Sequence, residues 1–423
     1  MPYTRQEKEN SQPAAMNTLT KRTFIGRLLT SLGAPVVFLD RLPNGVIPTA
    51  LAQESGLLDD VPDYKKQLTI LSDRPLNAET PAHLLDDSIT PNHLHFVRNN
   101  GHIPERAKKQ DLTGWGLTID GEVERPRTFT MAALKREFPH QTAQITLECA
   151  GNGRAGYYPS ASGNQWTLGA VGCARYSGIR LRDLLNTLGV RQSAVYIGYY
   201  GEDPHLSRDP NKHPISRGVP IEKALDPHTL LAWEMNGQPL PKEHGFPLRL
   251  ICPGWPGSTS GKWLKRIWVR DQVHDGTKMT GSSYRTPTHP VEPGESVPES
   301  DMAIIESMPV KSLITSPKTG ITTPQGKDIE IRGHAWSGSG DVERVDVSYD
   351  FGATWQTTNL SSAPNRYAWQ RWTCQINLPK KGYYEVWARA TDSQGKAQPM
   401  IVPGWNPKGY LNNAMHRIAI KVS

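Results

Sequence analysis

The residues best suited to chemistry surround Cys149. The chain leaves an apolar-alternating stretch and continues as Thr146-Leu147-Glu148-Cys149-Ala150-Gly151-Asn152-Gly153-Arg154. Gly151 and Gly153 let the backbone approach a bulky ligand. Arg154 adds a permanent cation near the sulfur, which favours a thiolate over a thiol. This spacing predicts a loop in which a cysteine holds a ligand, and the alternative is a small buried hydrophobe beside a turn.

The number and spacing of the cysteines restrict which ligand the Cys149 loop could hold. The 423 residues include 4 cysteines, none in a CxxC or CxxCH arrangement. Zinc ribbons, iron–sulfur clusters and covalently attached c-type haem need such clusters. A metal cofactor held by a single thiolate remains compatible with the sequence.

Length and charge set the broad class of the protein. A chain of 423 residues predicts about two domains and a tail. The net charge is +7, but Lys and Arg are dispersed, so nucleic-acid binding is not expected. A basic surface instead suits a small oxyanion or an acidic redox partner. Mean hydropathy is -0.54, and no apolar run approaches the roughly 18 residues of a membrane span, so no span is expected in the mature protein.

Residues 1–52 have the pattern of an export signal. The basic pair Lys21-Arg22 precedes a moderately apolar segment, and Ala50 and Ala52 suit cleavage before Gln53. The segment resembles a twin-arginine leader in which Lys21 replaces the first arginine, and translation could also start at Met16. We therefore expect a periplasmic protein exported in the folded state. The alternative is an amphipathic N-terminal helix on the folded protein.

Export would place the remaining cysteines in an oxidising compartment. Three thiols allow at most one disulfide, and the sequence does not indicate which of them pair: Cys173, Cys252 and Cys374.

The patterning predicts an α+β protein in which a mixed α/β domain precedes an immunoglobulin-like β-sandwich. Residues 53–90 lack a clear period and are expected to form an extended arm. Residues 91–284 form the mixed domain, with one amphipathic helix expected from Ser177 to Leu188. A Pro- and Glu-rich linker is expected at 285–307. Alternating apolar residues, as in Val345, Val347 and Tyr349, then predict the sandwich at 308–423.

From about residue 90 to the C-terminus the chain resembles the sulfite oxidase family of molybdopterin enzymes, and in particular bacterial periplasmic sulfite dehydrogenases without a haem domain. The resemblance rests on ordered motifs: Phe96-Val97-Arg98-Asn99, the Cys149 loop, Glu234-Met235-Asn236-Gly237, His244-Gly245-Phe246-Pro247-Leu248-Arg249, Lys262-Trp263-Leu264, Ala335-Trp336-Ser337-Gly338, and Gly404-Trp405-Asn406 followed by Gly409.

The resemblance implies a molybdenum cofactor with one molybdopterin and no haem in this chain. Cys149 takes the position of the metal-ligating cysteine, and a soft thiolate suits a metal already held by sulfur. Cations and hydrogen-bond donors suit the anionic cofactor. By similarity the cofactor-binding residues are Phe96, Arg98, Asn99, Asp203, His244, Arg249 and Lys262.

The resemblance also implies a pocket for a sulfur oxyanion. Arg98 and Arg154 match the two pocket arginines of the family, and Lys408 occupies the position of a third. Guanidinium groups bind oxyanions through charge-assisted, often bidentate hydrogen bonds, whereas lysine keeps the charge without the planar fork. Tyr284 lies at the interval of the active-site tyrosine.

The implied activity is oxidation of sulfite to sulfate, with electrons passed to a separate cytochrome c-like acceptor. The C-terminal domain implies a homodimer. Alternatives are a sulfane dehydrogenase-type molybdenum subunit, a sulfoxide or nitrate reductase, and a non-catalytic binding protein, because fold alone does not give function.

Overall fold

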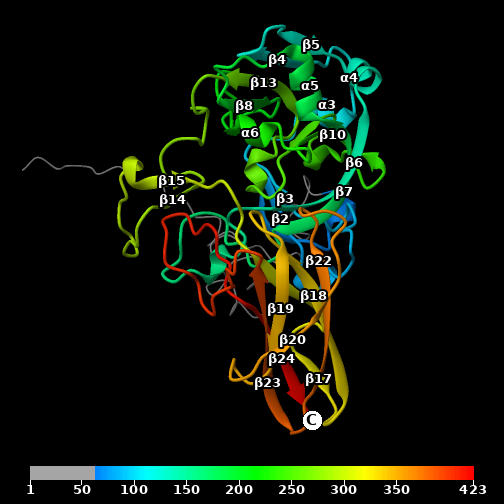
Figure 1. The fold of residues 1–423 in the computed structure, drawn as a ribbon, viewed down its shortest axis with the longest axis vertical. Coiled ribbons are helices and arrows are strands. Elements are labelled where there is room, and N and C mark those ends of the chain that lie inside the picture. The colour runs from blue at the N-terminus through cyan, green and yellow to red at the C-terminus, as the bar shows by residue number, and fades with distance from the viewer. Residues whose placement is uncertain (1–61) are drawn as a thin grey trace, which may run out of the picture. The chain divides into compact units, whose positions relative to one another are not determined.

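The computed structural model describes residues 62–423 (Figure 1). The expected leader at 1–52 and the beginning of the expected arm, up to residue 61, lie outside the described residues. The four cysteines are all buried and free, so no disulfide joins Cys173, Cys252 and Cys374.

The rest of the expected arm folds into a small sheet. Strands β1 (Thr69–Asp73) and β2 (Leu76–Glu79) form a hairpin, and β2 pairs with β3 (Val97–Arg98). Asn77 of β2 accepts hydrogen bonds from the Arg98 guanidinium at 3.2 Å and from the Asn99 amide at 3.0 Å. The segment before the main domain therefore helps to position two of the predicted site residues.

One sheet of the main domain carries Cys149 at a strand end. Strand β6 alternates buried Ala143, Ile145 and Leu147 with more polar positions, and it pairs with β7 without a register shift. The chain leaves β6 directly before Cys149. The strands, in sheet order, are β11 (Gln238–Pro239), β10 (Leu230–Met235), β7 (Val171–Arg180) and β6 (His140–Glu148), with β12 (Arg249–Ile251) also pairing with β10.

A second sheet and the helices α4 (Met131–Glu137), α5 (Leu181–Leu188) and α6 (Ile221–Ala224) enclose the largest apolar core of this domain. Its strands are β5 (Arg127–Phe129), β4 (Leu117–Gly121), β13 (Leu264–Arg270), β8 (Tyr196–Gly201) and β9 (Gly218–Pro220). A further helix is α3 (Glu105–Lys109). No helix among residues 62–423 is long and apolar enough to cross a membrane.

The amphipathic helix begins later than its sequence pattern predicts. The expectation of a helix from Ser177 was wrong, because residues up to Arg180 extend strand β7 and pair with β10. Gly178 marks this contact: a Cβ there would lie 1.9 Å from the Leu231 carbonyl oxygen. Helix α5 then buries the predicted leucines 181, 184, 185 and 188.

Short 3-10 turns carry several polar residues at the strand ends. They are η2 (Asp63–Lys65), η3 (Ala82–Leu84), η4 (Arg154–Gly156), η5 (Lys242–His244), η6 (Gly257–Thr259) and η7 (Glu299–Asp301). The Pro- and Glu-rich segment is not wholly irregular, since β14 (Arg285–Pro287) pairs with β15 (Met302–Ile304) around it. Strands this short leave too little alternation to be recognised in the sequence.

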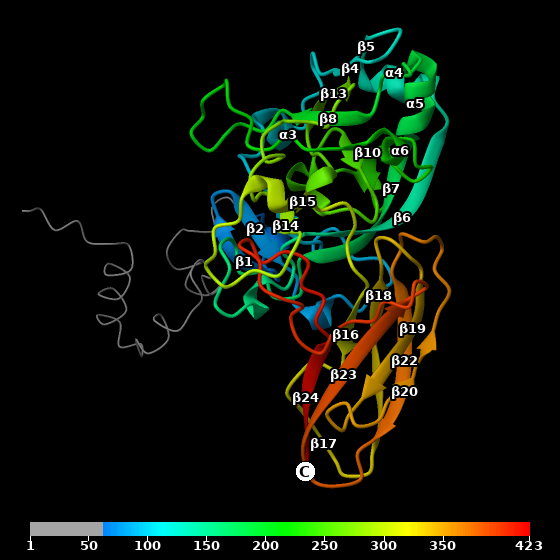
Figure 2. The ribbon, with the colours of Figure 1, turned by 60° about the vertical axis from the view of Figure 1, so that its left-hand side comes forward.

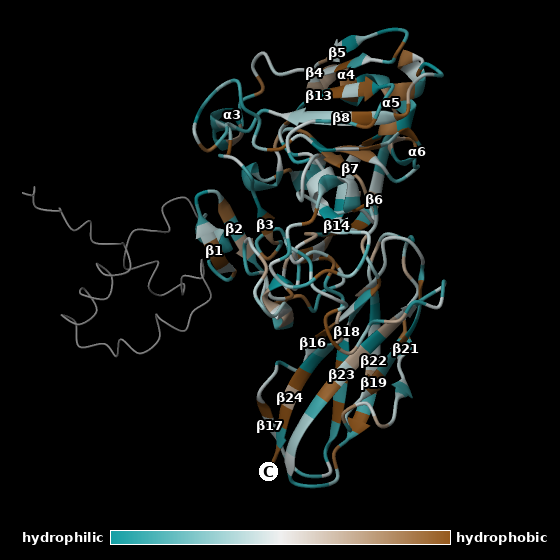
Figure 3. Cartoon of the chain, turned by 90° about the vertical axis from the view of Figure 1, so that its left-hand side faces the viewer, coloured by the Kyte–Doolittle hydropathy of each residue, from teal (hydrophilic) through white to brown (hydrophobic). Residues whose placement is uncertain are grey.

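The C-terminal residues form the expected β-sandwich (Figure 2). One sheet contains β16 (Lys311–Ser316), β18 (Asp328–Trp336), β22 (Gln370–Asn377) and β21 (Asn359–Leu360). The other contains β17 (Ile321–Thr323), β24 (His416–Val422), β23 (Gly382–Asp392), β19 (Val342–Ser348) and β20 (Gln356–Thr357). Apolar and polar residues alternate along these strands (Figure 3), and the apolar ones fill the space between the sheets.

A buried polar cluster joins the sandwich to the main domain beside Cys149. Glu148 Oε1 accepts hydrogen bonds from Lys311 Nζ at 2.5 Å and Asn152 Nδ2 at 2.9 Å, and Oε2 accepts one from Trp336 Nε1 at 2.8 Å. Each of these residues is buried. Lys311 and Trp336 belong to the sandwich, so the strand that ends at Cys149 is fixed by contacts from both domains.

Lys311→Met is therefore expected to destabilise the protein by roughly 3–5 kcal/mol, because it leaves Glu148 buried without its cation. Adding Glu148→Gln should restore part of that loss. Urea unfolding of both variants checks this. The matched control is Arg127→Met, which breaks a surface ion pair with Glu137 and should destabilise the protein much less. Equal effects of the two single substitutions would contradict the role of the buried pair.

Candidate functional site

The Cys149 loop is held by its own backbone and by Arg154. The Cys149 amide donates to the Ala170 carbonyl at 2.9 Å, and the Cys149 carbonyl accepts from the Asn152 amide at 2.9 Å. A Cβ at Gly151 would lie 2.3 Å from Arg154 Nη2, so a larger residue there would displace the guanidinium from its place over the loop. Cys149 is only 7% exposed, and it lines two adjoining cavities.

The first cavity brings together most of the predicted cofactor residues. Phe96 directly precedes strand β3, and Arg98 lies in that strand. His244 belongs to η5 and Arg249 to β12. Lys262 lies in the loop before β13, and Asp203 lies in the loop after β8. Asn99 lies beside it, bonded to Lys262. Segments far apart in the sequence therefore supply one site, as the resemblance to the family implied. His95, Tyr199 and Ser260 also line this cavity and were not predicted.

Positive charge dominates the wall of this cavity. Lys262 Nζ donates to the Arg98 carbonyl at 2.9 Å, the Glu243 carbonyl at 3.0 Å and Asn99 Oδ1. Burial lowers the pKa of Lys262 well below its usual range, and the Arg249 cation adds to this. Burial also lowers the pKa of Arg249. An anionic ligand would relieve this desolvated charge.

Unpaired polar atoms indicate that the ligand also forms hydrogen bonds. Asn99 Nδ2 and His95 Nε2 are buried and have no hydrogen-bond partner among the described residues. Leaving such a group unpaired costs about 1–3 kcal/mol, so a bound acceptor or donor would stabilise the site. The residues present therefore fit an anionic, hydrogen-bonding cofactor.

The second cavity places four cations close to Cys149. Arg98, Arg154 and Lys408 line it as the sequence motifs predict, and Lys278 is added. Arg154 Nε donates to the Lys408 carbonyl at 2.5 Å, which ties the two predicted residues together across 254 positions. Lys278 Nζ donates to Asn100 Oδ1 at 2.6 Å. No sequence motif marked Lys278, which lies in a loop and has a φ of 71°.

Tyr284 lies on the boundary of both cavities in a strained backbone conformation. Its φ is 53°, in the left-handed region that non-glycine residues rarely adopt. Its ring stacks on Tyr410 with a centroid distance of 5.4 Å. The Arg217 guanidinium lies 4.6 Å from the Tyr284 ring centroid, and its three nitrogens have no hydrogen-bond partner among the described residues. These contacts favour a functional role for the strain.

Arg217 was missed by sequence reasoning. It is 1% exposed, which is rare for an arginine without an acidic partner. Burial lowers its pKa, and nearby tyrosines oppose this. A single arginine in a loop carries no pattern that distinguishes it from a surface residue.

Asp203 introduces a pH dependence into the site. Burial raises the pKa of Asp203 from 3.8 to about 7, although Lys262 opposes this. Because the folded form keeps its proton to higher pH than the unfolded form, stability falls as pH rises from about 4 to about 7 and stays lower above that.

Asp203→Asn should remove this loss of stability at higher pH. The free energy of unfolding of cofactor-free protein is measured in urea for the variant and the wild type. The advantage of the variant over the wild type should grow between pH 4 and pH 7, by roughly 4 kcal/mol at most. The matched control is Asp271→Asn, at an exposed position. A difference independent of pH would contradict the burial of an ionisable carboxyl group.

Comparisons with known proteins agree with this geometry. A profile described as an oxidoreductase molybdopterin binding domain matches residues 101–278, and one described as a Mo-co oxidoreductase dimerisation domain matches residues 302–423. Sulfite oxidase of Gallus gallus is 35% identical over 364 residues, covering 83% of this chain and 77% of the relative. Mitochondrial sulfite oxidase of Homo sapiens is 34% identical and covers 89% and 70%.

More distant relatives extend the range of chemistry. Nitrate reductase [NADH] 2 of Phaseolus vulgaris is 33% identical over 82% of this chain and 41% of its own length. The crystal structure of the sulfane dehydrogenase SoxCD from Paracoccus pantotrophus superposes with a TM-score of 0.69 at 29% identity, covering 90% of this chain and 92% of that one. This chain therefore belongs to the sulfite oxidase family of molybdenum oxidoreductases, and its cofactor is molybdopterin-bound molybdenum.

Proposed function

We propose that the protein is a periplasmic sulfite dehydrogenase that oxidises sulfite to sulfate and passes the electrons to a separate cytochrome c-like acceptor. The observation that carries this proposal is the convergence of Arg98, Arg154, Lys278 and Lys408 on the cavity lined by Cys149. A cavity of this charge selects a small dianion over neutral molecules.

Cys149 Sγ would hold the metal, while Phe96, Arg98, Asn99, Asp203, His244, Arg249 and Lys262 would hold the pterin part of the cofactor. When bound, molybdenum supplies oxygen-atom transfer and takes up two electrons. The net reaction converts sulfite and water into sulfate, two protons and two electrons.

The protein side chains bind and orient the oxyanion. The guanidinium groups of Arg98 and Arg154 offer charge-assisted hydrogen bonds, and the ammonium groups of Lys278 and Lys408 add charge without a fixed direction. Because both arginines are already bonded to backbone or amide oxygens, their positions are set before substrate arrives. The Tyr284 hydroxyl can hydrogen-bond the substrate and exchange a proton there.

The remaining parts of the proposal concern location and partners. Periplasmic export rests on the Lys21-Arg22 leader. A homodimer is supported by the match of residues 302–423 to a dimerisation domain. A cytochrome c-like acceptor is proposed because the metal takes up two electrons, which a one-electron carrier protein would remove one at a time.

A sulfane dehydrogenase-type activity is the second candidate. The fold resembles SoxCD over nearly the whole chain, and the cationic cavity has a volume of about 390 Å³. That is more than ten water-sized volumes of about 30 Å³, whereas sulfite has only four non-hydrogen atoms. The metal held by Cys149 would fill part of this cavity, and a larger, carrier-bound sulfur group would use the remaining space.

Purified enzyme is expected to contain molybdenum and to reduce cytochrome c with sulfite far faster than with thiosulfate. Cys149→Ser should abolish this activity, because it removes the thiolate ligand. Cys374→Ser, at a buried sandwich cysteine, is the matched control and should stay active. Activity with a protein-bound sulfane but not with sulfite would favour the second candidate, and reduction of nitrate or sulfoxide would favour a reductase.

Substitutions at position 408 should change substrate affinity more than turnover. Lys408→Arg is expected to lower the KM for sulfite, since the guanidinium restores a planar fork, whereas Lys408→Met should raise KM about 10-fold or more. Steady-state kinetics at fixed ionic strength measures both. Lys421→Met removes an exposed lysine of β24 and should leave KM unchanged. Equal KM values in all four proteins would show that Lys408 does not contact the substrate.

A further inference from the structure

A lysine from outside the matched catalytic domain is buried against the cofactor cavity. Lys65 belongs to the turn η2, which precedes the residues matched by the molybdopterin-binding profile at 101–278. Its side chain is 0% exposed. Lysine is almost never fully buried unless its ammonium group is paired. The position of Lys65 therefore needs an explanation in terms of what its ammonium group binds.

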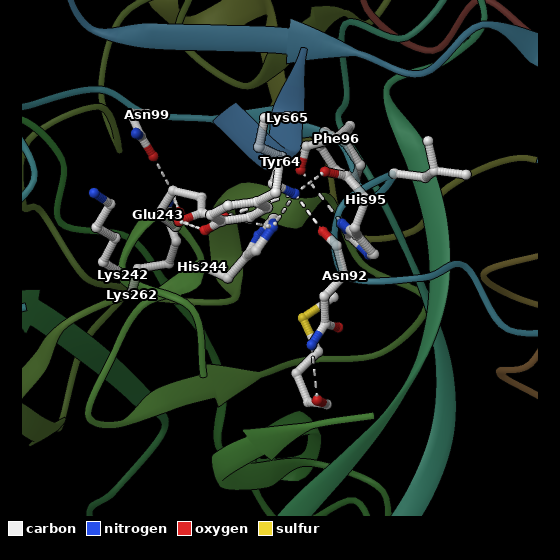
Figure 4. A network of polar contacts seen from close by, with 12 residues as sticks. Tyr64, Lys65, Asn92, His95, Phe96, Asn99, Lys242, Glu243, His244 and Lys262 are labelled. Carbon is white, nitrogen blue, oxygen red and sulfur yellow. Dashed lines mark hydrogen bonds and ion pairs between the residues drawn. The ribbon is translucent and has the colours of Figure 1, made fainter. Parts of the chain in front are cut away.

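The Lys65 ammonium group uses all of its donors (Figure 4). Its Nζ contacts the Asn92 carbonyl at 2.5 Å, the His95 carbonyl at 2.7 Å and His244 Nε2 at 2.8 Å. Burial lowers the pKa of Lys65 to about 8, although Glu243 opposes this, so the ammonium form predominates at neutral pH. An ammonium group has three donors and no acceptor.

The contact with Lys65 determines which nitrogen of His244 carries a proton. Because the ammonium group only donates, His244 Nε2 must accept, and the ring proton must lie on Nδ1. Burial lowers the pKa of His244 well below its usual range, and the charge of Lys65 adds to this, so the ring is neutral. His244 Nδ1 has no hydrogen bond to another described residue and remains a free donor. His244 itself lines the first cavity.

The charge of Lys65 is balanced without occupying the cavity. Glu243 Oε1 lies 3.7 Å from Lys65 Nζ. The neighbouring Tyr64 hydroxyl donates to Glu243 Oε1 at 2.7 Å and to Oε2 at 2.8 Å. Burial and the Glu243 carboxylate raise the pKa of Tyr64, so the phenol keeps its proton. Tyr64 and Lys65, which are adjacent in η2, thus fix the Glu243 carboxylate and the His244 ring, which both belong to η5.

We propose that Lys65 is a positioning residue of the cofactor site, which holds His244 neutral with its proton on Nδ1 and joins the segment Asn92–His95 to η5. The site is complete only when the turn Asp63–Lys65 has docked. His244 Nδ1 can then donate to an acceptor of the bound molybdopterin. This inference depends on the cofactor of the family and is independent of which sulfur compound the enzyme oxidises.

The test compares cofactor retention in Lys65→Met and in the charge-balanced double variant Lys65→Met/Glu243→Gln. Molybdenum and fluorescent oxidised pterin are measured per protein before and after prolonged dilution. The control is Lys66→Met, at the adjacent lysine, whose side chain is 45% exposed and pairs with Asp63 on the surface. Thermal unfolding of each variant reports any general loss of stability.

Lys65→Met is expected to lose cofactor on the order of ten-fold faster than the wild type, as substitutions behind a cofactor ligand commonly do. The double variant, which buries no unpaired charge, should recover thermal stability and still lose cofactor faster. Nitrogen-15 histidine spectra should show His244 leaving its Nδ1-protonated form in both. Wild-type retention in a stable double variant, or an unchanged His244 tautomer, would overturn the proposal. A wild-type protein without molybdenum would instead contradict the cofactor itself.

Discussion

A concentration of buried positive charge around one cysteine is the constraint on which the rest of the site depends. Arg98, Arg154, Arg249 and Lys262 lie in or beside two cavities that meet at Cys149. Such charges are costly to desolvate unless an anion joins them. The protein therefore specifies a site for an anionic cofactor in the first cavity, and the cations of the second cavity beside the same thiol suit the anionic substrate that we propose. A bound anion would reduce the repulsion between the cations that line each cavity.

The fold keeps this charge in place by fixing Cys149 from several directions. Strand β6 delivers the cysteine, and Glu148, the residue before it, is bonded to the sandwich through Lys311 and Trp336. The small N-terminal sheet positions Arg98 through Asn77. Domains that are separate in the sequence thus meet at one site. The sandwich and the N-terminal segment position residues of that site and also stabilise the fold.

Much of this arrangement could be predicted from the sequence, because motifs carry it. Cys149, Arg154 and Lys408 lie in short stretches with diagnostic spacing, and the alternation of the C-terminal strands predicts the sandwich that the structure contains. Lys65, Arg217 and Lys278 could not be predicted, since each is a single charged residue that only tertiary packing brings to the site. The helix expected from Ser177 failed for a related reason: pairing of β7 with β10 overrides the local helical period up to Arg180.

The most direct test of the account is X-ray absorption spectroscopy at the molybdenum edge, comparing wild-type enzyme with a Cys149→Ser variant that still holds the cofactor. If Cys149 ligates the metal, the variant has one fewer sulfur neighbour at the metal than the wild type, with an oxygen in its place. An identical sulfur shell in the two proteins would show that Cys149 is not a ligand, and the positive charge gathered around it would then need another explanation.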